Sequence, residues 1–143
     1  NRVLVDDFAA EVLEPAVHYD AFTDPEATKH FLRLRFAHEP HEIFACAYLD
    51  TRNRLIELAE LFRGTIDGCS VHPRVVAQRA LLVNAGAFIL VHNHPSGDPS
   101  PSKEDEVVTK TLVNAGVLLG ITVLDHIIIG ENSYISLREK GII

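Results

Sequence analysis

Apolar runs alternate with amphipathic segments along this chain, which predicts strands alternating with helices. The runs at 43–49, 87–91 and 121–129 have the length and the β-branched or aromatic content of buried strands. The amphipathic segments at 25–37 and 73–84 each open on a proline, a residue favoured in the first turn of a helix. The pattern therefore predicts an α/β (α+β) fold in which a mixed central β-sheet is flanked by helices.

A hairpin and a closing pair of strands complete the predicted sheet. Turn residues at 50–53 separate the run at 43–49 from a further apolar run at 55–62. Near the other end of the chain, 121–129 and 133–137 are expected to pair around a short turn. We expect 43–49 or 133–137 to form an exposed edge of the sheet, through which two copies of the chain could pair.

A third helix is predicted from Ser102 to about Ala115. Val108, Leu112 and Ala115 recur at helical spacing and form its apolar face. Gly116 is then expected just beyond the end of the helix, because glycine readily adopts the left-handed conformation that ends many helices.

The length and composition are those of a single domain. The chain has 143 residues, of which 47% are apolar, enough for one hydrophobic core. Residues 1–20 show little periodicity, so we divide the chain into an N-terminal arm or linker at 1–20 and one domain at 21–143. Cys46 and Cys69 stand in unrelated contexts, which favours reduced thiols and a cytoplasmic location. No secretory leader is expected, because no charged segment followed by an apolar one opens the chain. No membrane span is expected either, because polar residues and glycine interrupt the longest apolar stretch, at 117–129.

The charge balance argues against direct nucleic-acid binding by this domain. The chain has 20 acidic and 13 basic residues, which gives a formal net charge of −7. A nucleic-acid surface needs a basic face that displaces counterions from the phosphates. Lys29, Arg33 and Arg35 fall in one predicted helix, but such a group is more typical of a solvated helix face than of a binding patch.

Candidate metal ligands follow the predicted strand at 87–91. His92 and His94 are two residues apart, and side chains at this spacing share one face of an extended chain. A proline-rich loop then leads to Ser102, where the third helix begins and places Asp105 in its first turn. Two imidazoles and one carboxylate suit Zn²⁺, and three protein ligands leave a fourth position for water, as in catalytic zinc sites.

Each part of this motif has an alternative explanation. A histidine pair at this spacing also occurs by chance on protein surfaces. Ser102 and Asp105 match a helix capping box, which stabilises a helix without any chemistry and is compatible with a role in a site. The pair Asp125–His126 is more typical of a strand end than of a hydrogen-bond partner for a ligand imidazole. The remaining histidines have no partner at ligand spacing and lie at positions 18, 30, 38, 41 and 72.

The complete motif resembles the signature of the JAMM metalloprotease superfamily, also called MPN+ or JAB. In that signature H-x-H is followed after seven residues by serine and after two more by aspartate. The four positions here are His92, His94, Ser102 and Asp105. The resemblance implies the JAB/MPN (cytidine deaminase-like) architecture and a catalytic zinc.

Further segments resemble the RadC-like bacterial branch of this superfamily. They are the extended motif at 92–102 and the shorter segments at 64–65, 72–74 and 125–130, within a resemblance that covers about residues 25–143. The asparagine between the two histidines matches this branch, whereas eukaryotic members usually have serine or threonine there. The RadC name is associated with DNA repair, although nothing in these residues supports chemistry on DNA.

The superfamily resemblance also implies a general base. Its members use a glutamate just before the first strand of the sheet, and Glu42 has that position here, with Glu57 and Glu60 as the alternatives. Such a carboxylate takes a proton from the zinc-activated water and returns it to the leaving amine. Ser102 would donate a hydrogen bond to the oxyanion that develops on the attacked carbonyl.

The expected function is that of a zinc-dependent hydrolase of JAMM type, which cleaves a peptide, isopeptide or other amide bond in a protein or peptide substrate. The alternative is a catalytically silent metal-binding or interaction module in a DNA-repair-associated context. Zinc-dependent nucleoside deamination is disfavoured, because it requires H-x-E with P-C-x-x-C and this chain has neither.

Overall fold

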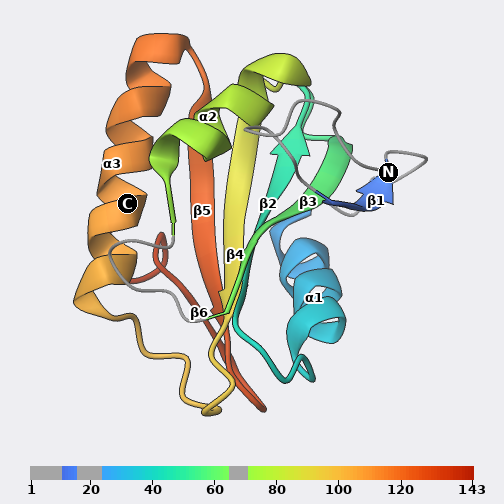
Figure 1. The fold of residues 1–143 in the computed structure, drawn as a ribbon, viewed down its shortest axis with the longest axis vertical. Coiled ribbons are helices and arrows are strands. Elements are labelled where there is room, and N and C mark those ends of the chain that lie inside the picture. The colour runs from blue at the N-terminus through green and yellow to red at the C-terminus, as the bar shows by residue number, and fades with distance from the viewer. Residues whose placement is uncertain (1–10, 16–23, 65–70) are drawn as a thin grey trace.

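The structure is a computed structural model, which describes residues 11–15, 24–64 and 71–143. These residues form three helices and one six-stranded sheet with the strand order β1-β3-β2-β4-β5-β6. Figure 1 shows α2 and α3 on one side of the sheet and α1 on the other. The predicted α+β class, with helices flanking a mixed sheet, is confirmed. The elements are β1 (Glu11–Pro15), α1 (Pro25–Phe36), β2 (Ile43–Leu49), β3 (Leu55–Arg63), α2 (Pro73–Leu82), β4 (Ala87–Asn93), α3 (Lys103–Leu119), β5 (Thr122–Ile129) and β6 (Tyr134–Ser136).

The sheet contains both parallel and antiparallel pairs. β4 and β5 are parallel, and β2 is antiparallel to β3 and to β4. A parallel pair needs a crossover connection, which α3 supplies between β4 and β5. β2 lies inside the sheet, so our prediction that 43–49 could be an exposed edge is wrong; its residues are buried on both faces, as an interior strand requires. β6, within the predicted strand 133–137, does lie at an edge.

Two hydrophobic cores lie on opposite faces of the sheet, because side chains alternate along each strand. Phe44, Cys46 and Tyr48 of β2 belong to the core that α2 and α3 cover. Ala45 and Ala47 belong to the core that α1 covers. The same alternation continues along β4 and decides which face its histidines occupy.

The two shorter helices begin where the sequence predicts. Asp24 caps α1 by accepting a hydrogen bond from the N–H of Glu26 at 3.1 Å. Pro73 is the first residue of α2, whose Val76 and Ala80 are fully buried. The two prolines were therefore sufficient to place both helix starts.

Two cations are buried within the described part of the chain. Lys29 is only 6% exposed and forms ion pairs with Glu26 and Glu139. Arg79 is 5% exposed, and its Nη2 lies 2.9 Å from Oε1 of Glu57. Lys29 is therefore buried, whereas we expected it on a solvated helix face. Partner carboxylates offset the cost of burying both cations.

Helix α3 is longer than predicted. It runs from Lys103 to Leu119 and ends at Gly120, whose φ of 72° is left-handed. Gly116, which we placed just beyond the helix, lies inside it. A Cβ at this position would be 2.3 Å from the carbonyl oxygen of Ile121. Gly116 therefore allows Ile121, just before β5, to approach the helix, and Gly120 ends the helix.

Part of the predicted N-terminal arm belongs to the sheet. Glu11–Pro15, within the arm or linker expected at 1–20, pairs as β1 with β3 in antiparallel orientation. The rest of that segment lies outside the described residues, as do Thr65 and Cys69. In the described ranges, none of the helices has both the length and the apolar composition that crossing a membrane requires.

Replacing Gly116 with alanine is expected to destabilise the protein. In an open helix interior this change stabilises by roughly 1 kcal/mol, but here the new methyl group would overlap the carbonyl oxygen of Ile121. We expect the free energy of unfolding in urea to fall by about 1–3 kcal/mol. Asn114→Ala, at an exposed position of the same helix, is the control and should not lose stability. An unchanged midpoint for Gly116→Ala would contradict the close approach.

Candidate metal centre

The end of β4 places both histidines of the motif on one side of the sheet. Phe88 and Leu90 of this strand belong to the core that α2 and α3 cover, and His92 continues the alternation. His92 is fully buried and stacks on Phe44, with ring centroids 5.9 Å apart. His94 follows the strand, is partly buried, and has its ring centroid 4.7 Å from that of His92. The predicted shared face is confirmed.

Asp105 meets the two histidines from the first turn of α3. Its Oδ1 lies 3.3 Å from Nε2 of His92, and its Oδ2 lies 3.4 Å from Nε2 of His94. The two Nε2 atoms are 2.8 Å apart. One ligand atom from each residue lies within 4.8 Å of the others, so the three could hold a metal ion. The three ligands expected from the sequence therefore converge.

The cap of α3 orients the Asp105 carboxylate. Ser102 Oγ accepts a hydrogen bond from the N–H of Asp105 at 3.1 Å, and Oδ2 of Asp105 accepts one from the N–H of Ser102 at 2.7 Å. These reciprocal bonds form the capping box considered above. The same interaction thus starts the helix and holds the carboxylate against the end of β4.

The electrostatics of the cluster favour a bound cation. Nδ1 of His94 lies 2.8 Å from the carbonyl oxygen of Asp98, which can only accept, so Nδ1 donates and a neutral ring directs its Nε2 lone pair toward Asp105. The hydrogen bond with Asp105 raises the pKa of His94. Burial lowers the pKa of His92 well below its ordinary value, and His126 adds to this effect.

Asp105 is held in its anionic form. Burial acts to raise its pKa, but the hydrogen bond with His94, the charge of His92 and the N–H of Ser102 outweigh burial and hold the pKa well below its usual range. The buried carboxylate therefore faces two imidazole Nε2 atoms across a space that a proton or a metal cation can occupy. This donor set fits the Zn²⁺ that the sequence motif implied.

A cavity of about 270 Å³ opens over the cluster. Glu42 reaches it because it precedes β2, whose Phe44 is paired with His92 of β4. The carboxylate of Glu42 also acts electrostatically to raise the pKa of His94. The residues that line the cavity are Glu42, His92, His94, Ser96, Ser102, Glu104 and Asp105.

The two alternative glutamates do not line this cavity. Glu57 is buried in its ion pair with Arg79. Oε1 of Glu60 lies 2.8 Å from Nη2 of Arg63, three residues further along β3. The placement of the three carboxylates therefore favours Glu42 as the group that could act on a molecule bound in the cavity.

Comparison with known proteins identifies the family. The family model for the RadC-like JAB domain matches residues 22–142. This chain belongs to that family. It is 52% identical to the UPF0758 protein of Thioalkalivibrio sulfidiphilus and 51% identical to that of Nitrosococcus oceani, in each case over 87% of this chain and 55% of the relative. It is 49% identical to the UPF0758 protein of Vibrio cholerae over 99% of this chain and 88% of the relative. The chain thus spans about half the length of the first two relatives, and none of these names states an activity.

In this RadC-like JAB domain, the asparagine between the histidines holds the segment that carries Glu42. Asn93 is buried, and its Oδ1 accepts a hydrogen bond from the N–H of Ile43 at 2.7 Å. Its Nδ2 donates to the carbonyl oxygens of His41 at 2.9 Å and Glu39 at 3.3 Å. The sequence showed Asn93 only as a mark of the RadC-like branch, because these partners lie 50 to 54 positions away.

The RadC-like domain also contains a third histidine beside the candidate ligands, which the sequence interpretation undervalued. Nε2 of His126 lies 2.9 Å from Nδ1 of His92. We favoured a strand end for Asp125–His126, but β5 continues to Ile129. The signal that could have indicated this contact was an unpaired polar residue inside an apolar strand, where a buried imidazole requires a partner.

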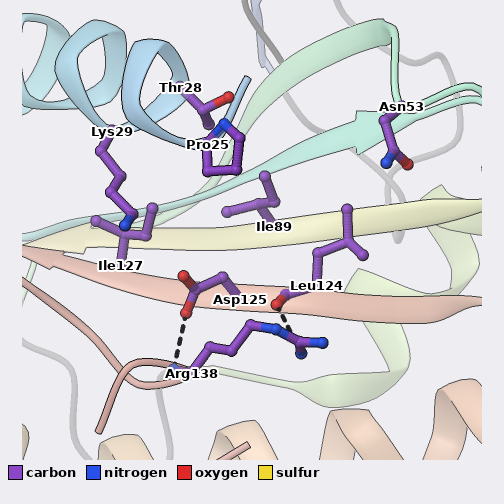
Figure 2. Close-up of a pocket in the computed structure, with 9 residues that line it drawn as sticks. All are labelled: Pro25, Thr28, Lys29, Asn53, Ile89, Leu124, Asp125, Ile127 and Arg138. Carbon is purple, nitrogen blue, oxygen red and sulfur yellow. Dashed lines mark hydrogen bonds between the residues drawn. The ribbon is translucent and has the colours of Figure 1, made fainter. Parts of the chain in front are cut away.

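Asp125 faces away from the cluster. Its carboxylate accepts hydrogen bonds from the N–H of Arg138 at 3.1 Å and from Ser136 Oγ at 2.5 Å. Figure 2 shows it beside Arg138 in a second cavity, of about 200 Å³, whose wall includes Pro25 and Thr28 of α1. Asp125 therefore joins Ser136 and Arg138 to β5. The next residue, His126, faces the candidate metal centre.

We expect the purified domain to bind about one equivalent of Zn²⁺ and to melt at a lower temperature once a chelator removes it. A ligand that binds only the folded state stabilises it by mass action, by about 2.7 kcal/mol at a hundredfold excess over its Kd. His92→Ala should abolish both metal uptake and the response to chelator. His30→Ala, an exposed histidine on α1, is the control. Elemental analysis and thermal melts measure both effects, and a wild-type protein without zinc at micromolar metal would contradict the site.

Proposed function

We propose that this RadC-like JAB domain is a zinc-dependent hydrolase of JAMM type that cleaves a peptide, isopeptide or other amide bond. The observation that supports it is the convergence of three ligand atoms, from His92, His94 and Asp105, at a cavity that Glu42 also lines. Three protein ligands leave a coordination position open, as hydrolytic zinc sites require. The bound metal would supply Lewis acidity, which activates water and polarises a carbonyl group.

The residues around the cavity would divide the remaining chemistry. The Glu42 carboxylate takes a proton from the attacking water and delivers it to the nitrogen of the leaving amine, which completes the cleavage of the amide bond. Ser102 Oγ already accepts the N–H of Asp105, and its hydroxyl hydrogen can donate to the oxyanion on the substrate carbonyl. The loop bonded to Asn93 keeps Glu42 at the required place.

We propose a protein or peptide substrate in the cytoplasm, handled without direct nucleic-acid contact by this domain. Among the residues that the structure describes, the lining of the cavity over the cluster has two glutamates besides Asp105 and no lysine or arginine. Such a lining would repel a phosphate backbone, in agreement with the formal net charge of −7. A neutral or cationic substrate is therefore compatible with this acidic lining.

Glu42→Gln should retain zinc and lose turnover. The amide keeps the size of the side chain but cannot accept the proton, so kcat should fall by about 10²- to 10⁴-fold. The measurement is hydrolysis of a peptide library and of isopeptide-linked peptides by zinc-loaded protein, with bound metal quantified in the same samples.

Glu60→Gln is the matched control for Glu42→Gln, because Glu60 is a competing glutamate that pairs with Arg63 and does not line the cavity. Its turnover should stay within twofold of the wild type. Equal losses in both variants would reject Glu42 as the base. A wild-type protein that holds zinc but cleaves nothing would instead favour the silent metal-binding module in a DNA-repair-associated context.

A further inference from the structure

Two fully buried polar side chains lie behind the ligand His92. Thr109 of α3 and His126 of β5 are both 0% exposed. They sit against the core that α2 and α3 cover, with the His126 ring 5.7 Å from that of Phe44 in an edge-on arrangement. Buried polar groups in such surroundings must satisfy their hydrogen bonds within the protein. The donors and acceptors of this small group can therefore be assigned one by one.

The hydroxyl of Thr109 sets the direction of the hydrogen bonds. Its Oγ1 lies 2.7 Å from the backbone carbonyl oxygen of Asp105, one turn earlier in α3. A carbonyl oxygen has no hydrogen to give, so the threonine hydroxyl donates to it. The Thr109 oxygen then acts as an acceptor toward Nδ1 of His126, which lies 2.5 Å away. His126 therefore carries a hydrogen on Nδ1.

The other ring nitrogen of His126 faces His92. Full burial beside an apolar core favours the neutral imidazole, which has a single N–H; in His126 this hydrogen is on Nδ1, so its Nε2 is an acceptor. Nδ1 of His92, 2.9 Å from that Nε2, must supply the hydrogen. His92 then has its lone pair on Nε2, the atom that faces His94 and Asp105.

We propose that Thr109 and His126 are positioning residues that hold His92 as the Nδ1–H tautomer with Nε2 directed at the metal. The reverse arrangement, with Thr109 donating to His126, would place a hydrogen on Nε2 of His92, where the metal must bind. The carbonyl oxygen of Asp105 excludes it by taking the threonine hydrogen. The backbone of one ligand thereby determines the tautomer of another.

This inference rests on the metal site of the proposed function but not on hydrolysis. Partners that hold a ligand imidazole in one tautomer typically contribute 10- to 100-fold in metal affinity. His94 has its own partner, the carbonyl oxygen of Asp98, so the two imidazoles are oriented separately. Loss of the Thr109 hydroxyl should therefore affect His92 and leave the His94 tautomer unchanged.

Thr109→Val tests the proposal, because it keeps the shape of the side chain and removes the hydroxyl. Zinc affinity, measured by competition with a chromogenic chelator, should fall 10- to 100-fold. Thr109→Ser restores the hydroxyl and should return the affinity to within about threefold of the wild type. Thr111→Val is the matched control, since Thr111 makes the same bond to a carbonyl one turn earlier, at 2.8 Å to Val107, but is exposed and touches no histidine.

The tautomer itself is measured by long-range ¹H–¹⁵N correlation spectra of wild-type protein, with and without zinc. We expect a protonated Nδ1 on His92 and on His126 in both samples, with zinc on Nε2 of His92. In the zinc-loaded protein, a hydrogen on Nε2 of His92, or the absence of zinc from that atom, would overturn the proposal. Unchanged zinc affinity in folded Thr109→Val would also overturn it. Because these spectra use the wild-type protein, they decide the question even if Thr109→Val does not fold.

The same measurements separate this proposal from the hydrolase. A wild-type protein with the expected tautomers and bound zinc but without turnover would support the positioning role and contradict the hydrolase. Turnover together with zinc on Nδ1 of His92 would support the hydrolase and contradict the positioning role.

Discussion

The crossover from β4 through α3 to the parallel strand β5 is the constraint on which the rest of the site depends. It brings the end of one strand, the first turn of a helix and the middle of a second strand together, and these positions carry His92, Asp105 and His126. Because strand side chains alternate, a shift of one residue in β4 would turn its histidines into the opposite core. The burial of Phe88 and Leu90 on one face and Ile89 and Val91 on the other strongly disfavours that shift.

The cluster places three imidazoles and a carboxylate beside an apolar core, which is unfavourable unless each polar atom has a partner. The structure provides those partners from the backbone and the fold. The helix cap holds Asp105, a loop carbonyl holds His94, and Thr109 with His126 holds His92. The nitrogen and oxygen atoms that remain directed inward are suited to a cation. The arrangement that satisfies the buried polar groups therefore also leaves a set of atoms that could hold a metal ion.

Local sequence signals were reliable where a single segment decides the outcome. Pro25 and Pro73 marked helix starts, and the capping box at Ser102 was recognisable from residues three apart. The end of α3 was misplaced because Gly116 and Gly120 are both glycines in an apolar segment. One permits a close approach and the other a left-handed turn, and only the position of the next strand distinguishes them.

The sequence by itself determined the fold class and the three candidate ligands, because strand alternation and helix capping act over a few neighbouring residues, and its motif resembled the family that the comparison then showed. Only the tertiary structure decided that β2 is an interior strand and that Glu42 reaches the cavity while Glu57 pairs with Arg79. It also decided what Asn93 and His126 contact. These outcomes depend on pairing between strands that are distant along the chain, and local periodicity does not specify which strands become neighbours or in which register.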